Sequence, residues 1–323
     1  MKQNGPTSPI SGIESAQFKT AAPSRSTFRG QILMLGSALT FAFLTLLIKI
    51  LGPEFRVWDI AMFRFIGSIA LMFIMFGRTM KPFQSPSIKM LIIRGISGTG
   101  AFLAMLTSVR MIPMSTAMVF FYTFPAFAAL FSPLFFKDRI SRPELLLVLT
   151  ALCGVGVLFD FRMEGSFFGQ FMGLIGGMCA GLTVSLIKKL SANNGAPEIY
   201  FYFCFLGAII IFPPFISNPN MPATMQDWLI VGGIILSSTA AQLLMNKGFR
   251  YCKSWEGGLI MTSELIFVAI LGILVLGEVM TWRLWVGGGM ILASAIAIDL
   301  IKRKTGAVNR LLVMRRKREP NTL

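Results

Sequence analysis

The sequence contains no histidine and little acidic charge, and both shortages limit what the chain can do. Its 323 residues include 14 aspartates and glutamates and only four cysteines, Cys153, Cys179, Cys204 and Cys252. Without histidine, the chain lacks the commonest general base and metal ligand. The cysteines form no CxxC pair, so neither a zinc site nor a disulfide framework is expected. We therefore expect no metal site and no cofactor, and an enzyme would depend on carboxylates, lysines or tyrosines.

Charged residues of either sign are scarce, which argues against a water-soluble protein. Only 14% of residues are charged and 54% are hydrophobic, whereas roughly a quarter of a soluble globular chain is charged. This composition predicts a polytopic membrane protein whose surroundings are the lipid bilayer. The net charge of +16 does not indicate a nucleic-acid partner, because the basic residues form short clusters between apolar runs and in the tails.

Long apolar runs dominate the rest of the chain. Each is close to the roughly 20 residues that a helix needs to cross about 30 Å of hydrocarbon. They predict an all-α polytopic membrane protein with ten transmembrane helices. The runs are Gln31–Leu51, Trp58–Gly77, Met90–Val109, Pro113–Phe136, Pro143–Phe161, Phe167–Ile187, Ile199–Ile216, Trp228–Met245, Gly257–Leu276 and Trp282–Ile301.

The lysines and arginines are distributed unevenly, which predicts an orientation. Most lie in the two tails and in every second loop, while the other loops hold Arg56, Arg110, Arg162 and Arg283. Because basic loops stay in the cytosol, we expect both termini to be cytosolic and the protein to lie in the cytoplasmic (inner) membrane. Residues 1–28 have no apolar segment and are predicted to be a disordered cytosolic tail. Residues 303–323 are predicted to be a basic cytosolic tail.

Short patterns of the first half recur in the second half in the same order and at a nearly constant spacing. Gly30-Gln31 and Leu47-Ile48-Lys49 return as Gly169-Gln170 and Leu186-Ile187-Lys188. We expect two repeats, 29–161 and 162–302, with five spans each. Because five is odd, the second repeat must enter the membrane inverted relative to the first. Inverted repeats are a common plan of secondary transporters, which bind substrate near the midplane where the halves meet.

The stretch Phe121-Tyr-Thr-Phe-Pro-Ala-Phe-Ala-Ala-Leu-Phe-Ser-Pro-Leu-Phe-Phe-Lys-Asp138 and its counterpart ending in Leu276-Gly-Glu278 resemble the drug/metabolite transporter superfamily, EamA type. The resemblance covers about residues 30–302. It departs from the usual pattern at Lys137-Asp138 in place of Gly-Glu, and at Leu265 in place of the proline that the first half keeps. It implies a central cavity lined by the first four helices of each repeat, peripheral fifth and tenth helices, and substrates such as amino acids, nucleotide-like metabolites or vitamins.

Glu264 is the strongest candidate site residue. It lies about 13 Å into its span at about 1.5 Å per residue, close to the middle of the bilayer. An acid inside a membrane usually faces a cavity, where it can bind a substrate ammonium or carry a proton. The alternative is an ion pair or hydrogen bond that only fixes helix packing.

Other polar residues inside the spans have similar alternatives. Arg64 can bind an anionic substrate group or pair with Glu264, or it can extend to the interface. Gln242 and Asn246 share one helix face and either line a pocket or join helices. We add Tyr122, Thr123 and Ser263 to the candidate substrate or coupling residues, although hydroxyls also serve packing. Pro125 is predicted to bend its helix as a hinge or a purely structural kink. Lys49, Lys188 and Arg94 are expected to extend to the membrane interface from near helix ends.

These patterns favour a secondary transporter of a small polar or amphipathic metabolite that works by alternating access. Proton coupling through Glu264 and facilitated diffusion both remain open, and the lack of a GxxxxGK[ST] motif argues against direct use of ATP. The alternatives are a membrane-embedded enzyme and a receptor of the same fold without transport. A homodimer is compatible with the sequence, but one chain suffices, because Gly177-Met-Cys-Ala-Gly181 is best explained by close packing within the chain.

Overall fold

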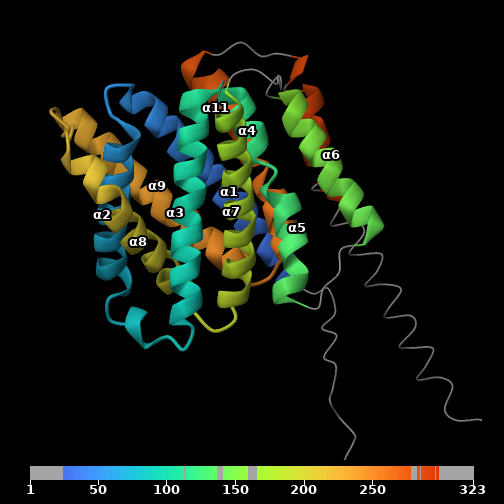
Figure 1. The fold of residues 1–323 in the computed structure, drawn as a ribbon, viewed down its shortest axis with the longest axis horizontal. Helices are drawn as coiled ribbons and strands as arrows, with labels where there is room; N and C mark the ends of the chain where they lie inside the picture. Colours follow the sequence, from blue (N-terminus) through green and yellow to red (C-terminus); the bar gives the residue numbers. More distant parts are fainter. Residues whose placement is uncertain are drawn as a thin grey trace, which may run out of the picture.

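The computed structural model describes residues 25–112, 114–136, 141–158, 166–277, 282–283, 285–294 and 296–297, and the regular structure in these ranges is helical (Figure 1). The helices are α1 (Arg25–Leu51), α2 (Val57–Phe76), the short 3-10 helix η1 (Pro82–Gln84), α3 (Ile88–Met111), α4 (Met114–Phe121), α5 (Phe124–Phe135), α6 (Arg142–Leu158), α7 (Phe167–Leu190), α8 (Ala196–Ile216), α9 (Met225–Gly248), α10 (Ser254–Met261) and α11 (Glu264–Leu276).

Eight helical segments of the described chain are long and apolar enough to cross a membrane. They correspond to α1, α2, α3, α7, α8 and α9 and to the pairs α4–α5 and α10–α11. The fifth expected span is α6, with 17 residues, and of the tenth the shorter apolar helix Trp285–Ser294 is described. The all-helical membrane fold is thus established, whereas the number of ten spans stays a prediction. Both predicted tails lie almost wholly outside the described residues.

Local sequence signals set several of the helix ends. The Thr224 hydroxyl accepts a hydrogen bond from the Asp227 backbone N–H at 3.1 Å, and the Asp227 carboxylate accepts one from the Thr224 N–H at 3.0 Å. This reciprocal cap satisfies two of the N–H groups that a helix start leaves open. At its C-terminal end, α11 is capped by Gly277. The φ of Gly277 is 67°, a left-handed conformation that glycine adopts without a Cβ clash.

Two of the membrane-length segments are interrupted at corresponding places. The first pauses at Tyr122 and Thr123 between α4 and α5, and the second at Thr262 and Ser263 between α10 and α11. Pro125 does not kink a continuous helix, because it lies in the first turn of α5, where no intrahelical N–H bond is needed. The other segment breaks with Leu265 at the matching position, so the interruption does not require proline.

The helices pack in two related sets. α3 packs along α7, and α1 packs along α9; α2 contacts α8 and α9, and α8 also contacts α3. α5 contacts α7 and α11 contacts α1, while α10 packs against α5. Helix α6 stands at the edge of the bundle (Figure 1). The largest buried side chains, which include Phe65, Tyr200 and Trp255, fill the space between the inner helices.

Contacts between loops distinguish the two ends of the bundle. At one end Ser85 hydrogen-bonds Asn194, and the Tyr202 hydroxyl donates to the Pro82 carbonyl at 3.2 Å. At the other, Asn220 donates to the Glu54 carbonyl at 3.0 Å. Arg56 at this second end pairs with Asp59 at 2.9 Å, and this hydrogen-bonded contact raises the pKa of Arg56.

Candidate functional site

A cavity of about 320 Å³ lies at the centre of the bundle. Its walls come from α1, α2, α3, the α4–α5 segment, α7, α8, α9 and the α10–α11 segment. Neither α6 nor the helix Trp285–Ser294 supplies a lining residue among those described. This is the arrangement that the family resemblance implies, with the first four helices of each half around the centre.

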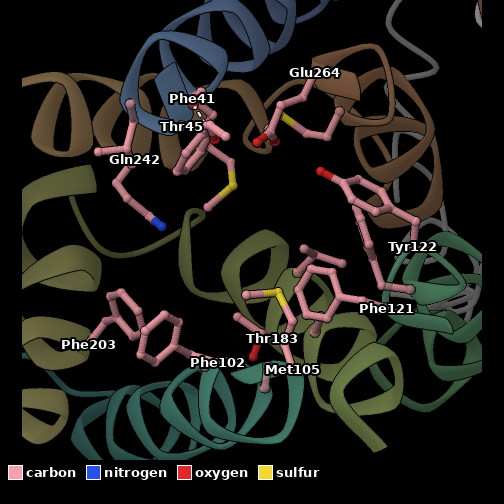
Figure 2. Close-up of a pocket in the computed structure, with 18 of the residues that line it drawn as sticks. Phe41, Thr45, Phe102, Met105, Phe121, Tyr122, Thr183, Phe203, Gln242 and Glu264 are labelled. Atoms are coloured by element: carbon pink, nitrogen blue, oxygen red, sulfur yellow. Dashed lines mark hydrogen bonds between the residues drawn. The ribbon is translucent and has the colours of Figure 1, made fainter. Parts of the chain in front are cut away.

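Glu264 enters the cavity from the first turn of α11 (Figure 2). As the first residue of α11, Glu264 lies at the positive end of that helix's dipole, which favours a carboxylate. The Tyr122 hydroxyl points toward this carboxylate from the matching interruption of the first half (Figure 2). Arg64 is also close enough to act on Glu264 electrostatically. The half-buried acid therefore has a phenol and a cation nearby, and the cavity on its open side.

Arg64 projects from α2 and is held by a network of hydroxyl groups. Its Nε donates to Ser238 Oγ of α9. The Tyr200 hydroxyl lies 2.9 Å from both Ser238 Oγ and Ser68 Oγ, and Thr239 donates to Ser68 at 2.9 Å. These buried bonds join α2, α8 and α9, so they fix the guanidinium at the cavity wall instead of leaving it to extend toward an interface.

Arg94 corrects the prediction that it reaches the membrane interface. The residue lies more than one turn inside α3, its side chain is only 1% exposed, and it lines the cavity. Its guanidinium lies over the Phe203 ring, 4.6 Å from the centroid, and Nη2 is 3.4 Å from Gln242 Oε1. The sequence did carry a signal, since Arg94 lies well inside an apolar run as Arg64 does. Nothing in the spacing, however, says that it faces inward.

Gln242 and Asn246 share a helix face but differ in surroundings. Gln242 lines the cavity next to Arg94. Asn246, one turn further along α9, is buried outside the cavity lining, and its Nδ2 donates to the Ala196 carbonyl at 3.3 Å. The structure thus places Gln242 at the candidate site and gives Asn246 a contact between helices.

The hydroxyls of Thr123 and Ser263 do not line the cavity. Each donates to a backbone carbonyl of the preceding helix, Thr123 to Phe120 and Ser263 to Ile260, the latter at 2.6 Å. The same two carbonyls also accept the backbone N–H of Thr123 and of Ser263, at 3.2 and 3.1 Å, so the hydroxyls reinforce the turn at each break. Their position supports the two helix breaks and gives them no contact with the central space.

The rest of the cavity wall is mainly apolar, with hydroxyl groups at Thr45 and Thr183. Thr183 is 2.9 Å from Ser97 Oγ, so its hydroxyl has a protein partner. A wall of this kind, with few polar groups placed among aromatic and thioether side chains, is typical of sites for small molecules. The aromatic and methionine residues are Phe41, Phe102, Met105, Met118, Phe121, Tyr122, Phe124, Phe203, Met245 and Met261 (Figure 2).

Comparison with known proteins agrees with this architecture. A pseudopaline exporter of Pseudomonas aeruginosa is 24% identical over 275 residues, which cover 85% of this chain and 97% of that protein. Solute carrier family 35 member G1 of Mus musculus is 24% identical over 237 residues, 68% of this chain and 61% of that protein. A solved crystal structure shares the fold with a TM-score of 0.74 and 17% identity, covering 87% of this chain and 99% of the other.

The family model for EamA-like transporters matches the chain twice, over residues 28–159 and 167–299. These two matches span most of the sequence, and relatives of both bacterial and mammalian origin are named as transporters or solute carriers. A membrane transporter handles a small molecule within a lipid environment and is not an enzyme. The chain therefore belongs to the EamA-like transporter family.

Proposed function

We propose that this chain is a secondary transporter that carries a small polar or amphipathic metabolite across the cytoplasmic membrane by alternating access. The solute would be of the size of an amino acid, a nucleoside-like compound or a vitamin-like compound. The observation that carries the proposal is the central cavity, to which both halves of the chain contribute charged or amide side chains. Its volume of about 320 Å³ is within the usual range of small-molecule sites.

Paired helix contacts support two inverted repeats of five spans, 29–161 and 162–302. If α1, α2 and α3 correspond to α7, α8 and α9, then the α3–α7 contact corresponds to α9–α1, and α3–α8 to α9–α2. Both members of each pair are observed. The interruptions between α4 and α5 and between α10 and α11 fall at matching positions. Two similar halves that meet around one site can exchange conformations and so open it to either side.

The cavity chemistry favours a solute with both polar and apolar parts. Glu264 can receive an ammonium group, Arg64 an anionic group, and the aromatic and methionine wall an apolar body. Glu264 can also take up and release a proton during the cycle, which would couple transport to a proton gradient. Facilitated diffusion needs no such step and is the other mode.

Counterflow in liposomes tests the transport function. Purified protein is reconstituted into vesicles loaded with one unlabelled candidate solute, and entry of its labelled form is followed. Accumulation above the level of empty vesicles supports a transporter. Conversion of the solute would instead favour a membrane-embedded enzyme, and binding without any flux would favour a receptor. Because a relative is named as an exporter, the first direction to measure is net flux out of vesicles in which the cytosolic face of the protein points into the lumen.

A further inference from the structure

We propose that Arg94 is the main anion-binding residue of the cavity and that the chain therefore selects solutes with a carboxylate group. This inference rests on the proposed transport function, because it names the chemical class of the solute that the same cavity takes. Of the described cavity residues, Arg94 combines a permanent charge with nearly complete burial and two nitrogen atoms that have no hydrogen-bond partner.

The hydrogen-bonding capacity of Arg94 is largely unused within the protein. Only Nη2 has a protein partner, the Gln242 side-chain oxygen at 3.4 Å, while Nε and Nη1 are buried without one. A guanidinium keeps its proton in proteins and offers five N–H donors in a fixed plane. Buried donors of this kind are almost always satisfied, by protein or by ordered water. Arg94 is part of the cavity lining, so a solute that accepts hydrogen bonds could satisfy these buried donors once the side chain turns toward it.

The surroundings hold the guanidinium in place without neutralising it. The Phe203 ring of α8 lies under it at 4.6 Å, and Gly98 of α3 leaves the space that Nη1 occupies: a Cβ on Gly98 would lie 3.1 Å from that nitrogen. The charged neighbour that acts on it is Arg64 of α2, which is of like sign. Among the described residues no carboxylate forms an ion pair with Arg94.

Glu264 is not the carboxylate partner of Arg94, because it is associated with Arg64 and Tyr122. Figure 2 shows Gln242, the hydrogen-bond partner of Arg94, on one side of the cavity and Tyr122 on the other. The cavity lining thus holds two guanidinium groups and one carboxylate. A carboxylate of the solute at Arg94 would accept a hydrogen bond from an open donor and balance the remaining charge, and such charge-assisted hydrogen bonds are among the strong ones.

The solute then has a defined orientation. Its carboxylate lies at Arg94 and Gln242, its apolar body lies against Phe102 and Phe121, and an ammonium group, where present, lies at Glu264. A zwitterion with an apolar side chain uses all three parts, and a simple carboxylate uses two. A cationic amide uses neither of the Arg94 donors well, because a neutral carbonyl is a weaker acceptor than a carboxylate.

Four phenyl compounds test the proposal in a binding assay. L-phenylalanine has both charged groups, 3-phenylpropionate has the carboxylate alone, L-phenylalaninamide has the ammonium alone, and 3-phenylpropionamide has neither. Stabilisation of the detergent-solubilised protein is titrated with each compound. We expect each carboxylate to bind the wild type about tenfold or more tightly than its amide, as a charge-assisted hydrogen bond to arginine would give. In Arg94→Gln this preference should disappear, while the ammonium preference should remain.

Controls separate the anion site from a structural role of Arg94. Arg78→Gln removes an exposed charge in the loop after α2 and should keep the carboxylate preference. Without ligand, Arg94→Gln should unfold at a temperature equal to or above that of the wild type, because it removes a buried charge that the protein itself does not pair. A large drop in that temperature would instead show that Arg94 supports the fold.

The proposal is overturned if neither carboxylate stabilises the wild type, if amides and carboxylates bind equally, or if the preference survives in Arg94→Gln. These outcomes are read from binding and do not depend on flux. Carboxylate-selective binding without counterflow would leave the anion site intact and remove the transport function. Counterflow of cationic or neutral solutes alone would keep transport and remove the anion site.

Discussion

Glu264 and Arg94 show two ways in which a charged side chain can be held inside an apolar bundle. Glu264 is the first residue of α11, faces a phenol and lies near a guanidinium, so the protein itself provides partners for the carboxylate. Arg94 lies over an aromatic ring, and two of its nitrogen atoms have no hydrogen-bond partner. The first arrangement suits a residue that exchanges a proton or binds an ammonium group, and the second suits a residue that binds an anionic group of the solute.

Replacing Glu264 with glutamine should reduce transport about tenfold or more, because the amide cannot pair with an ammonium group or carry a proton. Measurement in two modes distinguishes these roles. If Glu264 carries the proton, uptake driven by a pH gradient is lost while counterflow remains; if it binds the ammonium group, both are lost. The matched control is Glu54→Gln in an exposed loop. Wild-type rates in both modes would remove Glu264 from the mechanism.

Gly98 helps to position Arg94, because its lack of a side chain leaves room for the Arg94 guanidinium and the Phe203 ring. A Cβ at this position would lie 3.0 Å from the Phe203 ring and 3.1 Å from Arg94 Nη1. We expect Gly98→Ala to weaken binding of 3-phenylpropionate severalfold by displacing the guanidinium, with overpacking of about 1–3 kcal/mol as the physical cause. Gly100→Ala on the same helix is the control, since its Cβ would meet nothing within 4 Å. Equal affinity in both variants would contradict this role.

Single residues in the spans were predictable where the free-energy cost of burying a charge in the membrane is enough to single them out. A carboxylate or guanidinium deep in an apolar run must have a partner or a cavity, so Glu264 and Arg64 could be chosen from the sequence, and both line the cavity. The same reasoning placed Arg94 wrongly, because distance from a helix end does not say whether a side chain faces lipid or protein. Asn246 shows the same limit: a pocket and a contact between helices were both open, and although it shares a helix face with Gln242, it donates to the Ala196 carbonyl and is not part of the cavity lining.

At the scale of the helix, the two interruptions position the site. Tyr122 and Glu264 both adjoin a break, and both reach the cavity from there. The first break packs against α7. Gly177 and Gly181 of that helix lie against the backbone at the end of α4 and the start of α5. The GxxxG pattern thus serves packing within the chain, as the sequence indicated. The positions of the apolar spans were also predictable, but the breaks were not, since Pro125 follows its break and the second break has no proline.

Gly177→Ala should destabilise the bundle at the first break. The new Cβ would lie 2.6 Å from Thr123 Oγ1 and 2.7 Å from the Phe120 carbonyl oxygen, so backbone would have to move. We expect a loss of about 1–3 kcal/mol, seen as a lower unfolding temperature in detergent. Gly232→Ala in α9 is the control, because its Cβ would meet nothing within 4 Å and alanine favours the helix. An unchanged unfolding temperature in Gly177→Ala would show that α7 does not need to approach the break so closely.

At the scale of the whole molecule, the loops that meet at one end carry more basic residues than those at the other. Arg78 and Lys81 belong to the loop that contacts Asn194, and Lys89 lies in the first turn of α3 directly after that loop. Lys188 and Lys189 lie close to Asn194 in the chain, whereas the opposite end has Arg56 paired with Asp59. The alternation seen in the sequence is therefore a difference between two faces of the folded bundle. Because basic segments remain on the cytosolic side of a membrane, we propose that the end with Asn194 faces the cytosol.

Labelling of single cysteines in intact cells tests this orientation. In a background with Cys153, Cys179, Cys204 and Cys252 replaced, we expect a membrane-impermeant thiol reagent to label Glu54→Cys and Asn218→Cys, which lie in exposed loops at the end with Arg56. Thr79→Cys and Asn193→Cys, exposed near the other end, should be labelled only after the cells are opened. The two positions of each pair belong to different predicted repeats, so agreement within each pair also follows from an inverted second half. Labelling of all four positions in intact cells would mean insertion in both orientations, and labelling of only the second pair would reverse the assignment.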